Sequence, residues 1–300
     1  MDDDNAPAAD SAPPYRHIAD VLRGEILDGR YQVGERIPAQ ADLEQRFGVS
    51  RPTIQRALGV LRESGFIDNQ RGRSAEVLPW RARGADAAPT GAEGPQPAFA
   101  ALAEHVADAF QEREVTIDAF SLTAETLNTA LSHQLHRIQT GEVRSPDFVR
   151  IRLLLPAPDA RLAYPRSVAD PEDERPLRRL RDLIRGHCIA MRSSFNSTQR
   201  LTHLQGSLEF RTVPITPLHK LYLINKSLAL LGYYKLVNRP IMFDEQWEDM
   251  YDVLGIDAQL FLQRRDVAEP EAVASRFVSE AQEWFDSLWS TIAEPMKLFT

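Results

Sequence analysis

One stretch without large apolar side chains divides this sequence and limits what it can fold into. Residues 81–98 read RARGADAAPTGAEGPQPA and consist mainly of Ala, Gly, Pro and charged residues. Such a composition cannot form a hydrophobic core and is typical of a flexible linker. We therefore expect two domains, of residues 15–80 and 99–300. Residues 1–14 carry four Asp and no basic residue, and we expect them to be disordered.

The composition sets broad limits on the class of protein. Hydrophobic residues make up 43% and charged residues 26% of the chain, which is typical of a folded soluble protein. The single cysteine, Cys188, excludes an intramolecular disulfide and fits a reducing cytoplasm. No apolar stretch approaches the ~20 residues of a membrane span, and the acidic start lacks the apolar segment of a signal peptide. We expect a cytoplasmic protein with no membrane partner.

Charge is spread unevenly along the chain. The net charge of the whole chain is −8, which taken alone argues against a nucleic-acid partner. Residues 15–80 carry 10 Arg against nine acidic residues, a net charge of +1. Because phosphate contacts are made by one face of a domain, the local pattern matters more than the total.

Residues 15–65 have the pattern of a helix-turn-helix. Apolar residues recur at helical spacing in YRHIADVLRGEILDGRY, in IPAQADLEQRFGVS and in SRPTIQRALGVLRESG. Gly48 is expected to end the second helix, and Ser50 to cap the third. In this arrangement the helix after the turn enters the major groove of DNA.

The exposed face of the third predicted helix indicates DNA binding. Residues 51–62 include Arg51, Arg56 and Arg62 and no acidic residue. Side chains at the start of such a helix reach base edges, and the helix terminus favours phosphate. Residues 65–78 then read as two strands around a basic turn at 70–73, a wing that can reach the minor groove. The alternative, a solvated basic helix face, does not account for the turn, the cap and the wing together.

Residues 15–80 resemble the winged-helix domain of the GntR family of bacterial transcription regulators. The matching segments are GRYQVGERIP (29–38), FGVSRPTIQRAL (47–58) and RGR (71–73), in the family's order. The resemblance implies DNA contacts by residues at the start of the third helix and in the wing. The family often has Arg at the position of Gln55. The Gln amide favours adenine, whereas an Arg would favour guanine. The predicted DNA-binding residues are Ser50, Arg51, Thr53, Gln55, Arg56, Arg71, Gly72 and Arg73.

Beyond the linker, strand and helix patterns alternate. Segments 115–121 and 148–156 read as strands, and the segments between and after them as amphipathic helices. Three further strands follow in SLEFRTVPI, HKLYLIN and LALLGYY, and the chain ends in an amphipathic helix that closes the core or, alternatively, pairs with a second subunit. This order predicts an α/β domain with a mostly parallel sheet and flanking helices.

The segment HKLYLINKSLALLGYY (219–234) resembles the motif of one half of a phospholipase D-like domain, and the order of elements agrees. That superfamily carries His, any residue, Lys, an Asp further on, and then Gly-Ser. Counted from Lys220, Asn225 falls at the Asp spacing and Gly232 at the Gly spacing. The resemblance implies that His attacks phosphorus while Lys binds the phosphate oxygens.

Three departures from this motif argue against catalysis. His219 and Lys220 are adjacent, so without a bulge they point to opposite faces of a strand. Asn225 cannot supply the acidic partner, and Tyr233 replaces the usual Ser. We therefore predict no enzymatic activity, no cofactor and no metal site.

A degenerate pocket can still bind a small anionic or phosphorylated effector. Arg178, Arg181 and Arg185, at i, i+3 and i+7 of a predicted helix, can assist, or they form a solvated helix face. The predicted ligand-binding residues are His219, Lys220, Asn225 and Tyr233, with Tyr222 as a further candidate.

The sequence thus predicts a homodimeric transcription regulator that binds a double-stranded DNA operator. Its C-terminal domain dimerises and senses a ligand. One alternative is a phosphodiesterase of the phospholipase D-like superfamily that its N-terminal domain directs to DNA. Another is a C-terminal domain that only dimerises or docks a protein.

Overall fold

The chain divides into two compact units in a computed structural model. The N-terminal unit comprises residues 1–91 and 238–249, and the C-terminal unit comprises 92–237 and 250–300. Among the described residues, none of the helices combines the length and the hydrophobicity needed to span a bilayer. The structure describes residues 14–27, 30–32, 34–63, 66–68, 74–78, 96–243, 246–253 and 258–298.

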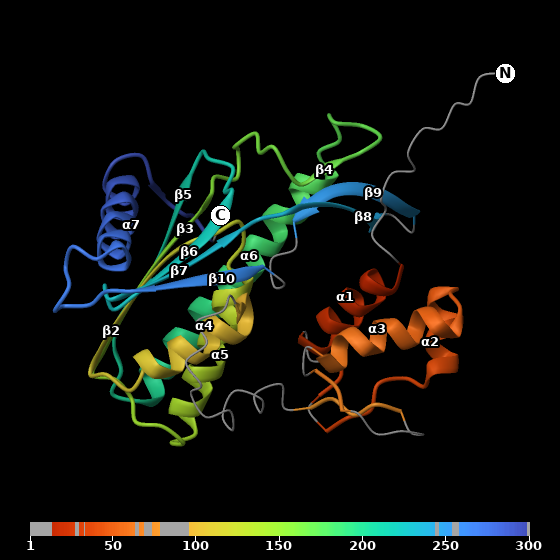
Figure 1. Cartoon of the computed structure of the whole chain (residues 1–300), viewed down its shortest axis with the longest axis horizontal. Helices are drawn as coiled ribbons and strands as arrows, with labels where there is room; N and C mark the ends of the chain where they lie inside the picture. Colours follow the sequence, from red (N-terminus) through yellow and green to blue (C-terminus); the bar gives the residue numbers. More distant parts are fainter. Residues whose placement is uncertain are drawn as a thin grey trace. The chain divides into compact units, whose positions relative to one another are not determined.

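Helices and strands are labelled in Figure 1. The helices are α1 (Pro14–Leu27), α2 (Gln40–Phe47), α3 (Arg51–Glu63), α4 (Ala98–Ala109), α5 (Glu125–Gln139), α6 (Arg175–Leu201) and α7 (Val273–Ser290). The strands are β1 (Gln96–Pro97), β2 (Glu114–Phe120), β3 (Phe148–Pro156), β4 (Arg166–Ser167), β5 (Gln205–Val213), β6 (His219–Ile224), β7 (Leu228–Tyr233), β8 (Leu236–Phe243), β9 (Gln246–Val253), β10 (Gln259–Arg264) and β11 (Glu294–Pro295).

Three helices and three short extended segments make the winged helix of the N-terminal unit. One apolar core joins α1, α2 and α3. Backbone hydrogen bonds connect segment 34–37 to segment 75–77, and Ile67 pairs antiparallel with Val77. Gly48 has a φ of +62°, a left-handed conformation that favours glycine and ends α2 before the turn into α3. The predicted winged helix-turn-helix is confirmed.

The sheet of the C-terminal unit is mixed. Its strand order is β1-β10-β7-β6-β2-β3-β5-β11. Strands β8 and β9 pair in a smaller sheet, and both include residues of the segment 238–249 of the N-terminal unit. In the larger sheet only the neighbours β2–β3 and β3–β5 pair parallel. The α/β class with flanking helices is confirmed, but the expectation of a mostly parallel sheet is wrong. After β5 the chain returns through connections 214–218 and 225–227, which are too short for the crossover helix that a parallel neighbour requires.

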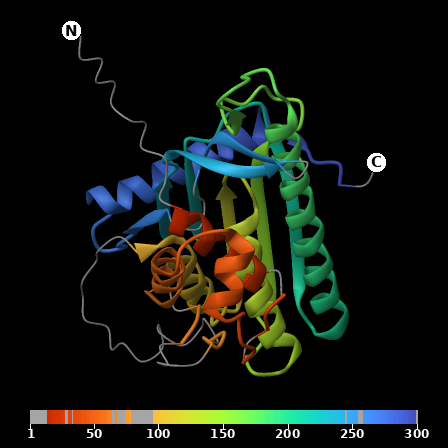
Figure 2. The same cartoon turned by 90° about the vertical axis from the view of Figure 1, so that its right-hand side faces the viewer.

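Helices cover both faces of the larger sheet (Figures 1 and 2). One core lies between the sheet and α4, α5 and α6, and it includes Ile117 and Tyr222. A second core lies between the sheet and α7, and it includes Phe120 and Leu221. Because side chains alternate along a strand, the central strands β2, β3, β5, β6 and β7 contribute to both cores. The unit is therefore a three-layer α/β/α arrangement.

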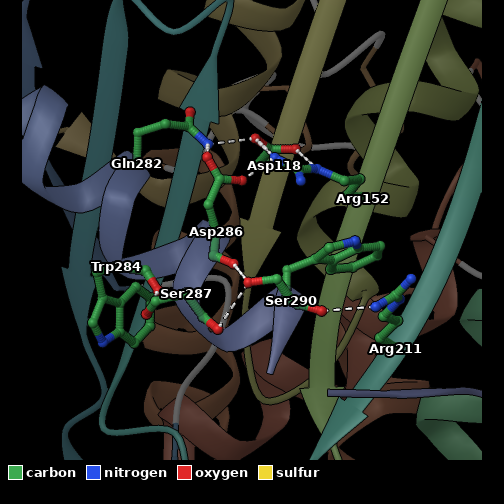
Figure 3. A network of polar contacts seen from close by, with 9 residues as sticks. Asp118, Arg152, Arg211, Gln282, Trp284, Asp286, Ser287 and Ser290 are labelled. Atoms are coloured by element: carbon green, nitrogen blue, oxygen red, sulfur yellow. Dashed lines mark hydrogen bonds and ion pairs between the residues drawn. The ribbon is translucent and has the colours of Figure 1, made fainter. Parts of the chain in front are cut away.

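Arg152 of β3 lies at the centre of a polar network on the α7 face of the sheet (Figure 3). Its guanidinium donates two hydrogen bonds to the carboxylate of Asp118 on β2, at 2.7 and 2.6 Å. The same guanidinium donates to Asp286 of α7 at 2.6 Å and lies over the ring of Phe285. The amide of Gln282 donates to both carboxylates. These contacts fasten α7 to β2 and β3.

Replacement of Arg152 should destabilise the C-terminal unit strongly. Asp118 is only 2% exposed, and Arg152→Gln would leave its carboxylate buried without a cation. We expect a loss of about 3 kcal/mol in the free energy of unfolding, measured by urea denaturation. Arg144→Gln is the control, since Arg144 is exposed in the same unit and forms no ion pair with any described residue. A loss below about 1 kcal/mol for Arg152→Gln would contradict this account of the network.

Candidate nucleic-acid interface

The amphipathic pattern of α3 decides which of its side chains face outward. Ile54, Leu58 and Leu61 are at most 3% exposed and fix one side of α3 in the core. Arg51, Gln55 and Arg56 are exposed on the opposite side. No acidic residue lies between positions 51 and 62. The outward face of α3 therefore offers two guanidinium groups and one amide to a partner.

Hydrogen bonds order the first turn of α3. The backbone N–H of Thr53 donates to the carbonyl oxygen of Ser50 at 2.9 Å, and their hydroxyl oxygens lie 3.0 Å apart. Ser50 is exposed and Thr53 is half-buried. The turn thus presents two hydroxyl groups beside Arg51 at the helix terminus, where an anionic phosphate is favoured.

Arg62 does not belong to the exposed face, which corrects the prediction. It is half-buried, and its Nε donates to the carbonyl oxygen of Asp68 at 3.2 Å. The Asp68 carboxylate in turn accepts a hydrogen bond from the backbone N–H of Glu76 at 3.0 Å. Arg62 therefore ties α3 to the strands of the wing. The predicted wing-tip residues Arg71, Gly72 and Arg73 lie outside the described residues.

An ion-pair cluster that was not predicted joins α1 to α2. Arg46 donates to both oxygens of the Glu25 carboxylate, at 2.8 and 2.5 Å, and Arg30 donates to the same carboxylate at 2.5 Å. Hydrogen bonds from Arg46 lower the pKa of Glu25. The cluster orients α2, the first helix of the helix-turn-helix, from the end of α1. Arg46 lies 21 residues from Glu25 in the sequence, so helical spacing gives no signal for this contact.

The family comparison agrees with this geometry. The family model described as "Bacterial regulatory proteins, gntR family" matches residues 14–77, which span α1 to α3 and the wing strands. Residues 14–77 form a GntR-family DNA-binding domain.

Curated regulators share this GntR-family domain. The HTH-type transcriptional regulator GgaR of Escherichia coli K12 is 33% identical over 70 residues, 23% of this chain and 28% of GgaR. The E. coli K12 repressor MngR of mannosyl-D-glycerate transport and metabolism is 37% identical over 65 residues, 22% of this chain and 27% of MngR. The putative regulator RmpR of Mycobacterium gastri is 48% identical over 69 residues, 20% of this chain and 25% of RmpR. This chain thus matches about a quarter of each relative's length.

Solved DNA-binding domains are similar to about a quarter of this chain. The AraR DNA-binding domain in complex with operator ORR3 is 32% identical, covers 22% of this chain and 80% of that chain, and has a TM-score of 0.22. The same domain with operator ORX1 is 30% identical, covers 24% of this chain and 89% of that chain, and has a TM-score of 0.23.

Outside the GntR-family domain, the predicted ligand residues His219 and Lys220 lie on opposite faces of the sheet. The His219 ring packs against Phe120 and Trp284 on the α7 face, with centroids 5.4 and 5.5 Å apart, and burial lowers its pKa. Lys220 is 1% exposed, and its Nζ donates to Thr126 of α5 at 3.3 Å. Residues 219–224 pair with β7 without a bulge, so strand alternation separates the two side chains.

The other two predicted ligand residues lie elsewhere. Asn225 is in the β6–β7 turn, where its side-chain oxygen accepts the Thr116 backbone N–H at 2.8 Å. Tyr233 is 58% exposed and contacts Phe261 edge-on. The structure therefore does not bring the four predicted ligand residues together in one pocket. Gly232 has a packing role, since a Cβ there would lie 2.7 Å from a side-chain carbon of Leu260.

The remaining candidates are dispersed. Arg178 and Arg185 are exposed on α6, and Arg181 is half-buried. Tyr222 is buried in the core on the α4–α6 face, and burial raises its pKa. Within the part of the chain that the structure describes, no three His, Cys, Asp or Glu side chains are placed to hold a metal ion.

The Glu25–Arg46 ion pair should make the stability of the N-terminal unit depend on pH. The pKa of Glu25 is lower in the folded state, so its contribution is present at neutral pH and is lost as the pH falls through that lowered value. At pH 7 we expect Glu25→Gln to lower the free energy of unfolding by about 1 kcal/mol, and at pH 3 by much less. Urea denaturation followed by circular dichroism measures both values. Glu44→Gln on α2 is the control, and a pH-independent effect of Glu25→Gln would contradict the assignment.

Proposed function

We propose that the chain is a sequence-specific DNA-binding transcription regulator. The observation that carries this proposal is the outward face of α3, where Arg51, Gln55 and Arg56 are exposed in an otherwise acidic protein. The GntR-family match at residues 14–77 and the curated regulators that share this domain support it. The regulator acts in the bacterial cytoplasm, where it reaches the chromosome.

Each residue of the proposed interface has a distinct role. Ser50, Arg51 and Thr53 contact the phosphate backbone and the first bases at the start of α3. Gln55 forms two hydrogen bonds with an adenine edge, and Arg56 contacts phosphate. Arg71, Gly72 and Arg73 form the wing contact. Phosphate contacts by these cations make the affinity depend on salt.

We infer that the regulator binds its operator as a homodimer. One winged helix reads few base pairs, and two copies on half-sites one helical turn apart multiply the affinity. On this proposal, residues 15–80 bind DNA, and residues 99–300 dimerise and sense a small anionic effector. Residues 81–98 are the linker between these two domains. Binding of the effector changes the placing of the two DNA-binding domains.

The C-terminal unit is proposed as a degenerate phospholipase D-like domain without catalytic activity. The order of β2, α5, β3, α6 and β5 supports an α/β domain of the expected connectivity. A catalytic pair needs His219 and Lys220 in one cavity, and they lie on opposite faces of β6. The phosphodiesterase alternative therefore gains no support.

Replacement of Arg51 tests the DNA-binding proposal directly. An operator is first selected from random double-stranded DNA with the full chain. Arg51→Ala should then weaken operator binding at least about tenfold in a gel-shift titration, because one charged contact is worth about 1–3 kcal/mol. Arg200→Ala, which removes an exposed arginine of α6, should bind as the wild type does. Equal affinities for wild type and Arg51→Ala would contradict the proposed interface.

Replacement of Gln55 tests how the base is read. Gln55→Arg should change the preferred base at one position of each half-site from adenine to guanine, since guanidinium groups pair with guanine and amides with adenine. Repeating the selection with this variant and sequencing the bound DNA measures the change. An unchanged operator sequence would show that Gln55 makes no base contact.

A further inference from the structure

A depression of about 950 Å³ opens at the edge of the sheet where β2 and β3 begin. The turn between β6 and β7 completes its wall. We call it the strand-start depression, and it lies wholly within the C-terminal unit. It shares only Asn225 with the ligand residues predicted from the sequence. Its lining residues are Glu112, Arg113, Glu114, Thr116, Asp147, Phe148, Arg150, Asn225, Lys226 and Ser227.

Two arginines on one face of β3 differ in their partners. In the parallel register of β2 and β3, Asp118 lies beside Arg152 and neutralises it. Two residues earlier in the same register, Thr116 lies beside Arg150. The Nε of Arg150 is buried and has no hydrogen-bond partner, although buried polar groups are nearly always satisfied. Arg150 thus lies on the same face of β3 as Arg152 but has no carboxylate opposite it on β2. It lines the depression.

The tight turn between β6 and β7 holds a second cation at the rim. Asn225 and Lys226 have φ values of +51° and +54°, a left-handed conformation that residues other than glycine rarely adopt. The backbone N–H of Asn225 donates to the Thr116 carbonyl oxygen at 2.8 Å, and its side chain accepts the Thr116 N–H. This double contact fixes the turn to β2.

The other charges at the rim restrict the chemistry of a ligand. Arg113 is already neutralised, because its guanidinium contacts the Asp147 carboxylate at 2.6 Å. Within the described part of the chain, Arg150 and Lys226 form no ion pair. Glu112 and Glu114 are exposed and can accept hydrogen bonds. A ligand that fits this site carries one anionic group, which pairs with the two cations, and several hydroxyl or amino groups, which donate to the two glutamates.

We propose that the strand-start depression binds the phosphate or carboxylate group of a small polar metabolite. The anionic group pairs with Arg150, as Asp118 pairs with Arg152, and Lys226 supplies the second charge. If the chain is the regulator proposed above, this site replaces the predicted His219 pocket as its effector site. The binding itself is independent of the DNA-binding proposal.

Titration of the full chain with inorganic phosphate, without DNA, tests the site. Calorimetry at constant ionic strength should show saturable binding to the wild type, and citrate in place of phosphate distinguishes a carboxylate ligand. Arg150→Gln should weaken the binding of the preferred anion at least about tenfold, because the charge-assisted hydrogen bonds are lost. Arg144→Gln removes an exposed arginine outside the depression and should bind as the wild type does.

A second variant keeps the test decisive if Arg150→Gln folds poorly. Thr116→Asp places a carboxylate beside Arg150 in the register that Asp118 has beside Arg152. It should raise the Tm in the absence of ligand and abolish anion binding. No binding of either anion to the wild type, or wild-type affinity in Thr116→Asp, would overturn the proposal. Because no DNA is present, neither result bears on operator binding by Arg51 and its neighbours.

Discussion

The ion pairs of Arg152 hold the layers of the C-terminal unit together. A charge removed from water is costly unless it is paired and hydrogen-bonded, so β2, β3 and α7 must all be in place before this guanidinium is satisfied. Asp286 and Gln282 come from the same helix, and their contacts fix the position of α7 on the sheet. The helix closes the core on this face of the sheet.

The same strand shows how one pattern serves both structure and function. Arg152 is neutralised within the fold, whereas Arg150 lines a depression and has Thr116 instead of a carboxylate beside it on β2. On the proposal above, the half-buried Arg150 guanidinium, which has no ion pair among the described residues, is available to an anion from solution. The proposed binding arginine and the structural arginine thus differ in their neighbour on β2: Arg150 lies beside Thr116, and Arg152 lies beside Asp118. In the N-terminal unit, likewise, arginines divide between structural pairs such as Arg46 and the outward face of α3.

Strong periodicity made much of the fold predictable. The winged helix and, apart from the short β4, the elements from β2 to β7 were predicted because their apolar residues repeat clearly and Gly48 marks the turn. The opposite orientation of His219 and Lys220 also followed from strand alternation. The strands β8 to β10 were not predicted, since Pro240 and several acidic residues interrupt their pattern and their pairing partners are distant. The sheet direction was wrong because it depends on which strands become neighbours, which local pattern does not encode.

Prediction of the site depended on long-range contacts in the same way. The sequence predicts that Arg62 lies on the basic face of α3. In the structure its Nε donates to the Asp68 carbonyl oxygen on the wing. The alternation in FVRIRLLLP places Arg150 and Arg152 on one face, a signal that was present but not interpreted. Which of the two is neutralised depends on β2 and α7, and only the folded chain shows it.

Capture of the DNA that the chain binds across a bacterial genome tests the central claim most directly. The account predicts a limited set of sites that share an inverted repeat, with half-sites about one helical turn apart. Diffuse, salt-sensitive binding without a shared sequence would contradict it, because α3 would then contact phosphate without reading bases.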